Sequence, residues 1–124
     1  EKYMVGGMKT EAGKDRIIPL NDMIIPLVKN RYDANKKYLI NNKFGNHYTY
    51  GTYMNGNFNT CMGKLKMKHL PHDGRHTFAS LMDSAGANDV CIKLIMGHSM
   101  KNDTTKGTYT HKTLEELLTE VNKI

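Results

Sequence analysis

The chain has 124 residues, enough for one domain with a continuous core but too few for two domains of ordinary size. Its net charge is +6; residues 113–124 carry −2, so residues 1–112 carry +8, which favours a polyanionic partner, nucleic acid first. No long apolar run or signal peptide indicates membrane insertion or export, so we expect a soluble cytoplasmic protein. Cys61 and Cys91 lack any CxxC spacing, and we expect both to be reduced core residues.

Two β-prone apolar runs, 3–8 and 16–20, flank a short polar segment near the start of the chain. Gly13 in that segment can supply the positive φ of a turn, so we predict a β-hairpin with lysines at its tip. Asn21 or Asp22 then caps a predicted helix at 22–35, with Pro26 near its first turn, since a deeper proline would break the helix. Residues 38–40 predict a further short strand.

The rest of the chain predicts helices. An apolar stripe recurs at helical spacing, weakened by three glycines, at Tyr50, Met54, Phe58, Met62 and Leu65. Pro71 begins a helix that stops near Gly86, and Asn88 caps another that ends at Gly97. Thr113 and Glu116 form a capping box for the last helix. The predicted fold class is mainly α with a small antiparallel β-hairpin, an α+β arrangement.

The stretch HDGRHTFAS, residues 72–80, raises the question of a metal site. His72 and His76 have the i, i+4 spacing of the zinc-protease signature, which leaves a zinc-dependent hydrolase as one alternative. However, Arg75 is a permanent cation close to such a metal, Asp73 is shorter than the usual glutamate base, and no third ligand is recognisable. We therefore expect no metal and no other cofactor. A plainer alternative is that these side chains are solvated groups on a polar helix face.

The order and spacing of the polar residues favour a third interpretation over a metal site or a solvated helix face. His98, in Gly97-His98-Ser99, follows Arg75 by 23 residues, and Tyr109 in TYTH follows 11 residues later. Together with KTEAGKDRIIPL (9–20), PHDGRHTFASLM (71–82), LIMGHS (94–99) and YTHKTLEELL (109–118), these residues closely resemble the C-terminal part of the tyrosine recombinase, or phage integrase, catalytic domain. The resemblance covers most of the chain, and its motifs are highly specific.

The resemblance implies a role for each matched residue. The implied catalytic set is the histidine and second arginine of H-x-x-R, the late histidine, the nucleophile and the hairpin lysine: His72, Arg75, His98, Tyr109 and Lys9. Lys14 is an alternative to Lys9 as proton donor to the leaving group. The implied protein is a bacterial or phage-encoded, nucleoid-associated site-specific recombinase. It would bind double-stranded DNA, cleave it through a 3′-phosphotyrosine and self-associate as a tetramer on DNA.

Two departures from the family pattern stand out. Gly74 occupies a position that is commonly leucine, and the family's first arginine has no counterpart, because Arg16 and Arg31 lie in other contexts. We therefore expect residues 1–124 to be the C-terminal portion of a catalytic domain, N-terminally incomplete, without the first-arginine segment and the N-terminal DNA-binding domains. The alternative is a DNA-binding remnant that cleaves nothing. Whether the last helix docks in cis or in trans is open, and we expect trans docking in the assembled protein.

Overall fold

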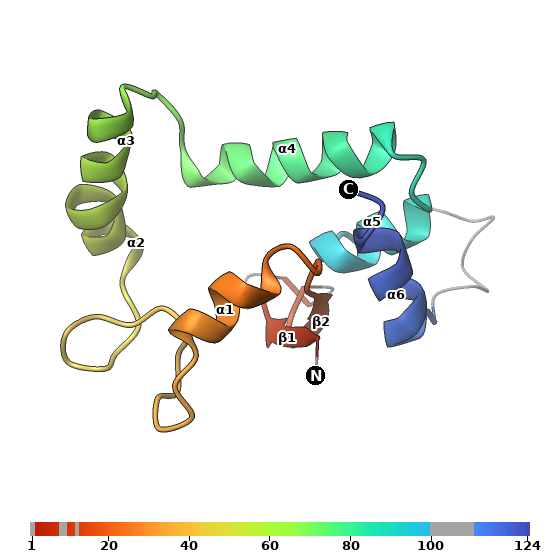
Figure 1. Cartoon of the computed structure of the whole chain (residues 1–124), viewed down its shortest axis with the longest axis horizontal. Helices are drawn as coiled ribbons and strands as arrows, with labels where there is room; N and C mark the ends of the chain where they lie inside the picture. The colour runs from red at the N-terminus through yellow and green to blue at the C-terminus, as the bar shows by residue number, and fades with distance from the viewer. Residues whose placement is uncertain (1, 8–9, 12, 100–110) are drawn as a thin grey trace. The chain divides into compact units, whose positions relative to one another are not determined.

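The computed structural model describes residues 2–7, 10–11, 13–99 and 111–124. The chain divides into two compact units. The hairpin unit consists of Glu1–Ile25 and Arg75–Ile124, and the inserted unit is Pro26–Gly74. The described elements are helices plus one two-stranded antiparallel sheet (Figure 1), which confirms the predicted α+β class. Of the described helices, none has the length and apolar character needed to cross a membrane.

The β-hairpin opens the hairpin unit, as predicted. Strands β1 (Tyr3–Gly6) and β2 (Arg16–Pro19) pair antiparallel, with Tyr3 opposite Pro19 and Gly6 opposite Arg16. Among the described residues of the turn, positive φ occurs at Gly7 (99°) and at Asp15 (49°). Gly13 is buried there and does not have the positive φ predicted for it.

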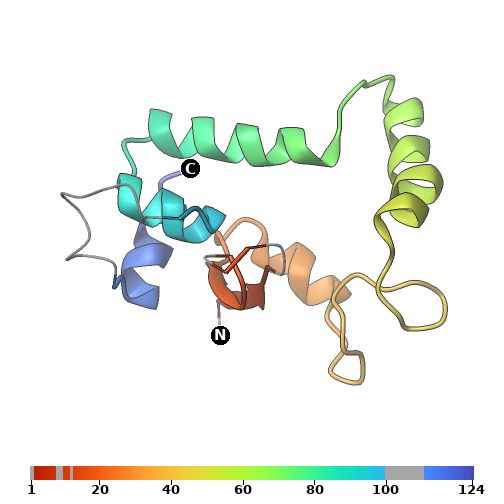
Figure 2. The same ribbon diagram turned by 180° about the vertical axis from the view of Figure 1, so that it is seen from behind.

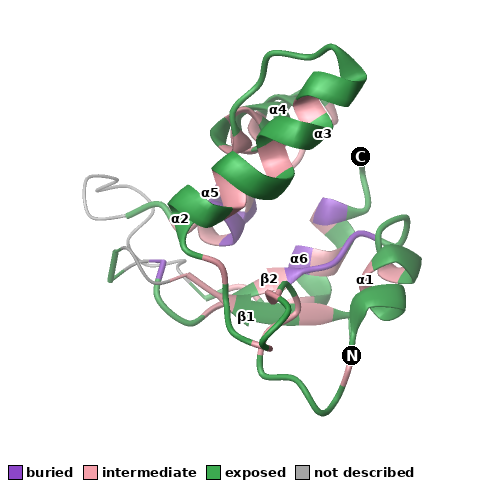
Figure 3. Ribbon diagram, turned by 90° about the vertical axis from the view of Figure 1, so that its left-hand side faces the viewer, coloured by how far each residue is buried: buried purple, intermediate pink, exposed green. Residues whose placement is uncertain are grey.

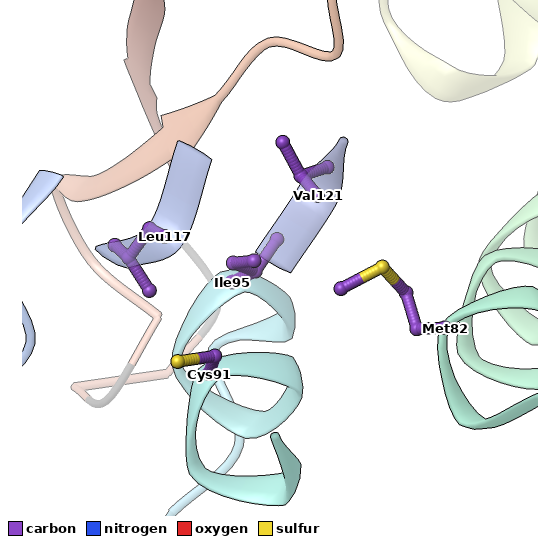
Figure 4. Close-up of a cluster of buried hydrophobic side chains, with 5 residues drawn as sticks. All are labelled: Met82, Cys91, Ile95, Leu117 and Val121. Atoms are coloured by element: carbon purple, nitrogen blue, oxygen red, sulfur yellow. The ribbon is translucent and has the colours of Figure 1, made fainter. Parts of the chain in front are cut away.

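Three helices form the core of the hairpin unit: the C-terminal part of α4 (Pro71–Ser84), α5 (Asp89–Met96) and α6 (Leu114–Val121). Figure 4 shows side chains from all three pointing toward one another: Met82, Cys91, Ile95, Leu117 and Val121. Both α5 and α6 also contact β2, and they lie beside the hairpin in Figures 1 and 2. Cys91 is buried among these side chains and is a small core residue, as predicted; its burial raises the pKa of the thiol.

The predicted helix ends of the hairpin unit are confirmed. Helix α4 stops before Gly86, which has a φ of 66°. The Asn88 side chain accepts from the main-chain N–H groups of Val90 and Cys91 at the start of α5. At α6, Thr113 and Glu116 form the capping box in both directions. Each of these devices satisfies main-chain groups that a helix leaves without an internal partner.

Asn21 caps the turn that leads into α1, although α1 itself begins only at Ile25, and its side chain has a second role that was not predicted. Its Oδ1 accepts from the Met23 main-chain N–H, and its Nδ2 donates to the carbonyls of Val121 and Ile124, each at 2.9 Å. In this chain α6 therefore docks in cis, against β2, α5 and the segment after β2. A trans arrangement in an assembled protein remains a prediction.

The inserted unit contains helical segments with no buried residue: α1 (Ile25–Arg31, which starts one residue before the unit), α2 (Tyr50–Thr52), the π-helix η1 (Tyr53–Phe58) and α3 (Asn59–Leu65). Pro26 lies in the first turn of α1, as predicted, but the helix is shorter than 22–35. The predicted apolar stripe does not form a core, since Tyr50 and Leu65 are 70% and 62% exposed. Cys61 in α3 is also exposed (α3 is mostly green in Figure 3), so its predicted core position is wrong.

The strand predicted at 38–40 is wrong as well. These residues are irregular, and within the described residues the sheet has two strands only, so no partner strand is present to form a ladder. The Tyr38 ring instead packs edge-on to the His47 ring, with centroids 5.4 Å apart. Its carbonyl accepts a hydrogen bond from the Asn41 side chain at 3.1 Å. Local side-chain contacts therefore replace strand pairing in this segment.

Candidate active site

Arg75 joins two of the motifs found in the sequence. It lies in α4, and its Nη2 donates to the Met96 carbonyl at 2.5 Å, at the end of α5. His98 follows two residues later and is exposed. The arginine of the first motif is therefore held directly beside the residues that lead into the Gly-His-Ser motif. A charged donor at a helix C-terminus is favourable, since that end of a helix carries partial negative charge.

A second arginine, which the sequence interpretation set aside, occupies the same place. Arg16 of β2 donates from Nε to the Ile95 carbonyl at 2.8 Å and from Nη1 to the Gly13 carbonyl at 3.0 Å. Burial and, secondly, the positive charge of Arg75 lower the pKa of Arg16 below its ordinary value. Arg16 and Arg75 are both among the residues that line a cavity of about 700 Å³ whose walls are mostly apolar. The two arginines therefore lie close together at the end of α5.

Together the two arginines complete the end of α5. A helix leaves its last four carbonyls without intrahelical partners. Here His98 N–H donates to Lys93 and Gly97 N–H donates to Leu94, with Gly97 in the left-handed region at a φ of 68°. The remaining two acceptors, on Ile95 and Met96, are taken by Arg16 and Arg75. All four carbonyls are thus bonded, and the position of His98 is tied to both arginines through one turn of main chain.

Glycines allow the hairpin to approach this helix end. A Cβ atom placed on Gly97 would lie 2.8 Å from the Gly13 Cα and 3.1 Å from the Arg16 Cδ. One placed on Gly7 would lie 1.8 Å from the Gly13 carbonyl oxygen. Gly13 and Gly97 therefore bring the main chains of the hairpin turn and α5 together. Arg16 lies at the centre of this contact.

The other candidate residues are placed less completely. His72 is exposed near the start of α4, three positions before Arg75 and so on the same side of that helix. Lys9 and Tyr109 lie outside the described residues, whereas Lys14 is described and exposed. The structure thus brings Arg75 and His98 to one helix end. Sequence reasoning missed Arg16, whose partner Ile95 lies 79 residues away; its only local signal was a charge at the start of an apolar strand.

The zinc alternative gains no support from the described residues, in which no group of three His, Cys, Asp or Glu side chains converges as metal ligands. Asp73, the expected stand-in for a glutamate base, accepts a hydrogen bond from the Leu70 main-chain N–H at 2.9 Å. It also contacts the His69 ring at 3.3 Å. Asp73 therefore helps to start α4.

Positive charge is divided unevenly between the two units. The inserted unit, 26–74, holds eight lysines and arginines against two aspartates, so the whole net charge of +6 lies within it. All eight cationic side chains are exposed, and so are the aromatic rings of Tyr32, Phe44 and Tyr50. The net positive charge that favoured a polyanionic partner therefore lies in the inserted unit.

Comparison with known proteins identifies the family. The model of the Phage integrase family matches residues 3–116, and the chain belongs to this family. A protein named tyrosine recombinase from Thermosipho africanus is 27% identical over 122 residues, which cover 94% of this chain and 42% of the relative. Tyrosine recombinase XerC from Staphylococcus saprophyticus is 30% identical over 117 residues, covering 86% of this chain and 38% of the relative. No solved structure gives a significant match.

Length separates the chain from these relatives. It spans about two fifths of each curated relative it matches, 42% and 38% of their lengths. The matched segment nevertheless includes the H-x-x-R stretch and the Gly-His-Ser stretch. Membership of the family is therefore established for the segment, and the activity of a whole protein is a separate question.

Proposed function

We propose that these residues are the C-terminal portion of the catalytic domain of a site-specific tyrosine recombinase. Such a protein cuts and rejoins double-stranded DNA through a 3′-phosphotyrosine intermediate. The observation that carries this proposal is the bond from Arg75 to Met96, which brings the H-x-x-R motif to the main chain that presents His98. Family membership and the recombinase names of both relatives agree with it.

The proposed chemistry assigns each motif residue a task. Arg75 binds the non-bridging oxygens of the scissile phosphate, since a guanidinium fork can bond two oxygens at once. His98 donates a further hydrogen bond to the phosphate, and its exposure leaves it accessible to DNA. Phosphoryl transfer depends largely on such positioning and charge stabilisation. Neither ATP nor a metal is needed in this scheme, because the phosphotyrosine conserves the energy of the broken bond.

Tyr109 is the proposed nucleophile. A tyrosine has a pKa of about 10, so on the order of one in a thousand is ionised near neutral pH and the proton must be removed. His72 is the proposed acceptor of that proton or a brace for the site. As the tyrosine oxygen bonds to phosphorus, the bond to the 5′-oxygen breaks, and Lys9, or less favourably Lys14, protonates that oxygen. In the reverse step a 5′-hydroxyl of the partner strand attacks the phosphotyrosine and restores the tyrosine.

DNA binding is proposed to involve the inserted unit. Exposed lysines and arginines neutralise phosphates with release of counterions, and exposed aromatic rings offer stacking surfaces. In the part of the chain that the structure describes, Lys64, Lys66 and Lys68 form no ion pair, whereas Lys2, Lys112 and Lys123 of the hairpin unit each pair with a carboxylate. The inserted unit thus holds cations that no carboxylate compensates, in keeping with its net charge of +6. Self-association on DNA as a tetramer is a further proposal, from family resemblance.

The experiment uses the full-length protein that carries these residues. Its site is first selected from randomised duplexes by binding, and a nicked suicide duplex is built on that site. The unmodified protein should form a covalent adduct that survives denaturing gels, and Tyr109→Phe should form none. An adduct of equal intensity in Tyr109→Phe would remove Tyr109 from its role. Loss of the adduct with a chelator would favour the metal alternative.

A second candidate concerns the 124 residues alone, which contain no counterpart of the family's first arginine. Arg16 is bonded to two main-chain carbonyls, and Arg31 lies exposed in α1. We therefore propose that the isolated chain binds duplex DNA weakly without cutting it. Efficient cleavage by these residues alone would contradict this.

A further inference from the structure

Arg16 is joined to the candidate site by contacts that involve only the main chain. Its Nε and Nη1 groups donate to Ile95 and Gly13, so one planar group connects the end of α5 to the hairpin turn. A guanidinium offers five donors in a fixed plane, whereas a lysine offers a single rotating nitrogen. The bridge therefore depends on arginine in particular, and positive charge alone does not replace it.

Arg75 is the neighbour most affected by this bridge. The Ile95 carbonyl, which Arg16 occupies, immediately precedes the Met96 carbonyl that Arg75 uses. Without Arg16, Ile95 becomes a second acceptor in the same helical turn, and the repulsion that now separates the two cations disappears. Arg75 would then have two alternative partners, and its free guanidinium edge would no longer point in a single direction.

Gly97 and Gly13 show how closely the hairpin turn packs against the end of α5. Because a Cβ atom on Gly97 would contact both Gly13 and Arg16, the turn that precedes His98 lies directly against the bridging side chain. Movement of the bridge therefore moves the main chain of His98 as well as the partner of Arg75.

We propose that Arg16 is a positioning residue for strand cleavage: it fixes the end of α5 and thereby the orientation of the Arg75 guanidinium relative to His98. This role rests on the proposed recombinase function. Arg16 need not touch the phosphate. A displacement of about 1 Å at a reacting group can cost about a hundredfold in rate, so loss of the bridge should be visible in cleavage.

The test measures the rate of covalent adduct formation by the full-length protein with two suicide duplexes. One carries the ordinary diester, and the other carries a methylphosphonate at the scissile position, which removes the negative charge that a guanidinium stabilises. Arg75→Ala should lose rate on the diester and recover on the methylphosphonate. Arg16→Lys, which keeps the charge but cannot form both bonds, should lose about ten- to a hundredfold on the diester. On the methylphosphonate it should come within about twofold of the unmodified protein.

Several results would overturn the role of Arg16. A full rate in Arg16→Lys on the diester would show that the bridge is dispensable, and an equal loss on both duplexes would indicate a structural defect alone. Arg16→Gln, an uncharged second variant, gives the same comparison if the lysine variant unfolds. Lys2→Ala removes an exposed charge of the same unit and should change neither rate. Absence of an adduct with the unmodified protein on both duplexes would instead overturn the proposed function, and the role of Arg16 with it.

Discussion

Asn21 donates its side-chain amide to the main-chain carbonyl of Val121, 100 residues away, at 2.9 Å, and to that of Ile124. Asn21 is buried, and Val121 is a core residue of α6. The side-chain amide of Asn21 therefore donates to two carbonyls at the end of α6, where the helix offers no further main-chain N–H donors. This contact fixes the end of α6 to the segment that follows β2.

Asn21→Ala should lower the free energy of unfolding by about 2 kcal/mol, because it leaves the buried carbonyl of Val121 and the partly buried carbonyl of Ile124 without this donor. Urea denaturation followed by circular dichroism gives the value. Asn35→Ala, at an exposed position of the inserted unit, is the matched control and should cost under about 0.5 kcal/mol. Equal effects of the two substitutions would show that the Asn21 contact adds nothing to stability.

Acid should weaken the docking of α6. The Thr113 main-chain N–H, and next Lys112, lower the pKa of Glu116; Lys123, and next the Asn88 N–H, lower that of Glu120. A carboxyl with a lowered folded pKa stabilises the fold above its unfolded pKa of about 4.3, and this stability is lost as the pH falls toward the folded value.

The melting temperature should therefore fall below about pH 4.3, and Glu120→Gln should make that fall smaller while lowering stability at neutral pH. Thermal unfolding across a pH series tests both statements. Glu115→Gln, on the exposed side of α6, is the control and should leave the profile unchanged. An unchanged profile in Glu120→Gln would mean that this carboxylate does not link α6 to the start of α5.

Gly97→Ala should destabilise the hairpin unit by more than about 1 kcal/mol, since it combines a left-handed φ with a Cβ contact of 2.8 Å to Gly13. Gly63→Ala, in α3, adds a Cβ with nothing within 4 Å and should be neutral or stabilise by up to about 1 kcal/mol. Chemical denaturation of the two variants measures both effects, and a loss of stability in Gly97→Ala no larger than that in Gly63→Ala would contradict the close approach at Gly97.

The salt dependence of duplex binding should identify the DNA-binding unit. Replacing Lys64 and Lys68 with glutamine should reduce the log–log slope by about 0.9 for each phosphate that is no longer neutralised. Lys2→Gln, in the hairpin unit, should leave the slope unchanged, because Lys2 already pairs with Asp22 at 2.9 Å. Fluorescence anisotropy at several salt concentrations provides the slopes. A larger change for Lys2→Gln would place the DNA-binding surface in the hairpin unit.

Local signals were the part of this structure that could be predicted. Asn88, Gly97 and the pair Thr113 and Glu116 act within one turn of their own helices, so their residue types and spacing predict their geometry. The hairpin is similar, because its strands are close in sequence. The family motifs added the residues of the candidate site, including Arg75 and His98.

Distant partners could not be predicted from spacing. Arg16 looked like an isolated charge before an apolar strand, and Asn21 looked like a helix cap, because their partners lie 79 and 100 residues further on. The strand predicted at 38–40 failed for a related reason, since β propensity requires a partner strand to have an effect. The apolar stripe from Tyr50 to Leu65 predicted helix correctly, but periodicity alone does not supply a surface to bury it.

The discontinuous hairpin unit has a consequence for synthesis of the chain. Its strands are made first, but α5 and α6, the helices that contact β2, follow the whole inserted unit, and α6 begins only at Leu114. At about 5–20 residues per second, roughly 5 to 20 s pass on the ribosome between Asn21 and Val121. During that interval the residues around Leu20 lack their contacts with α6. The inserted unit is one continuous segment, so all of its residues have already been synthesised. Premature termination before Leu114 would therefore release a chain whose hairpin lacks the cover of α6, a target for chaperones and proteases.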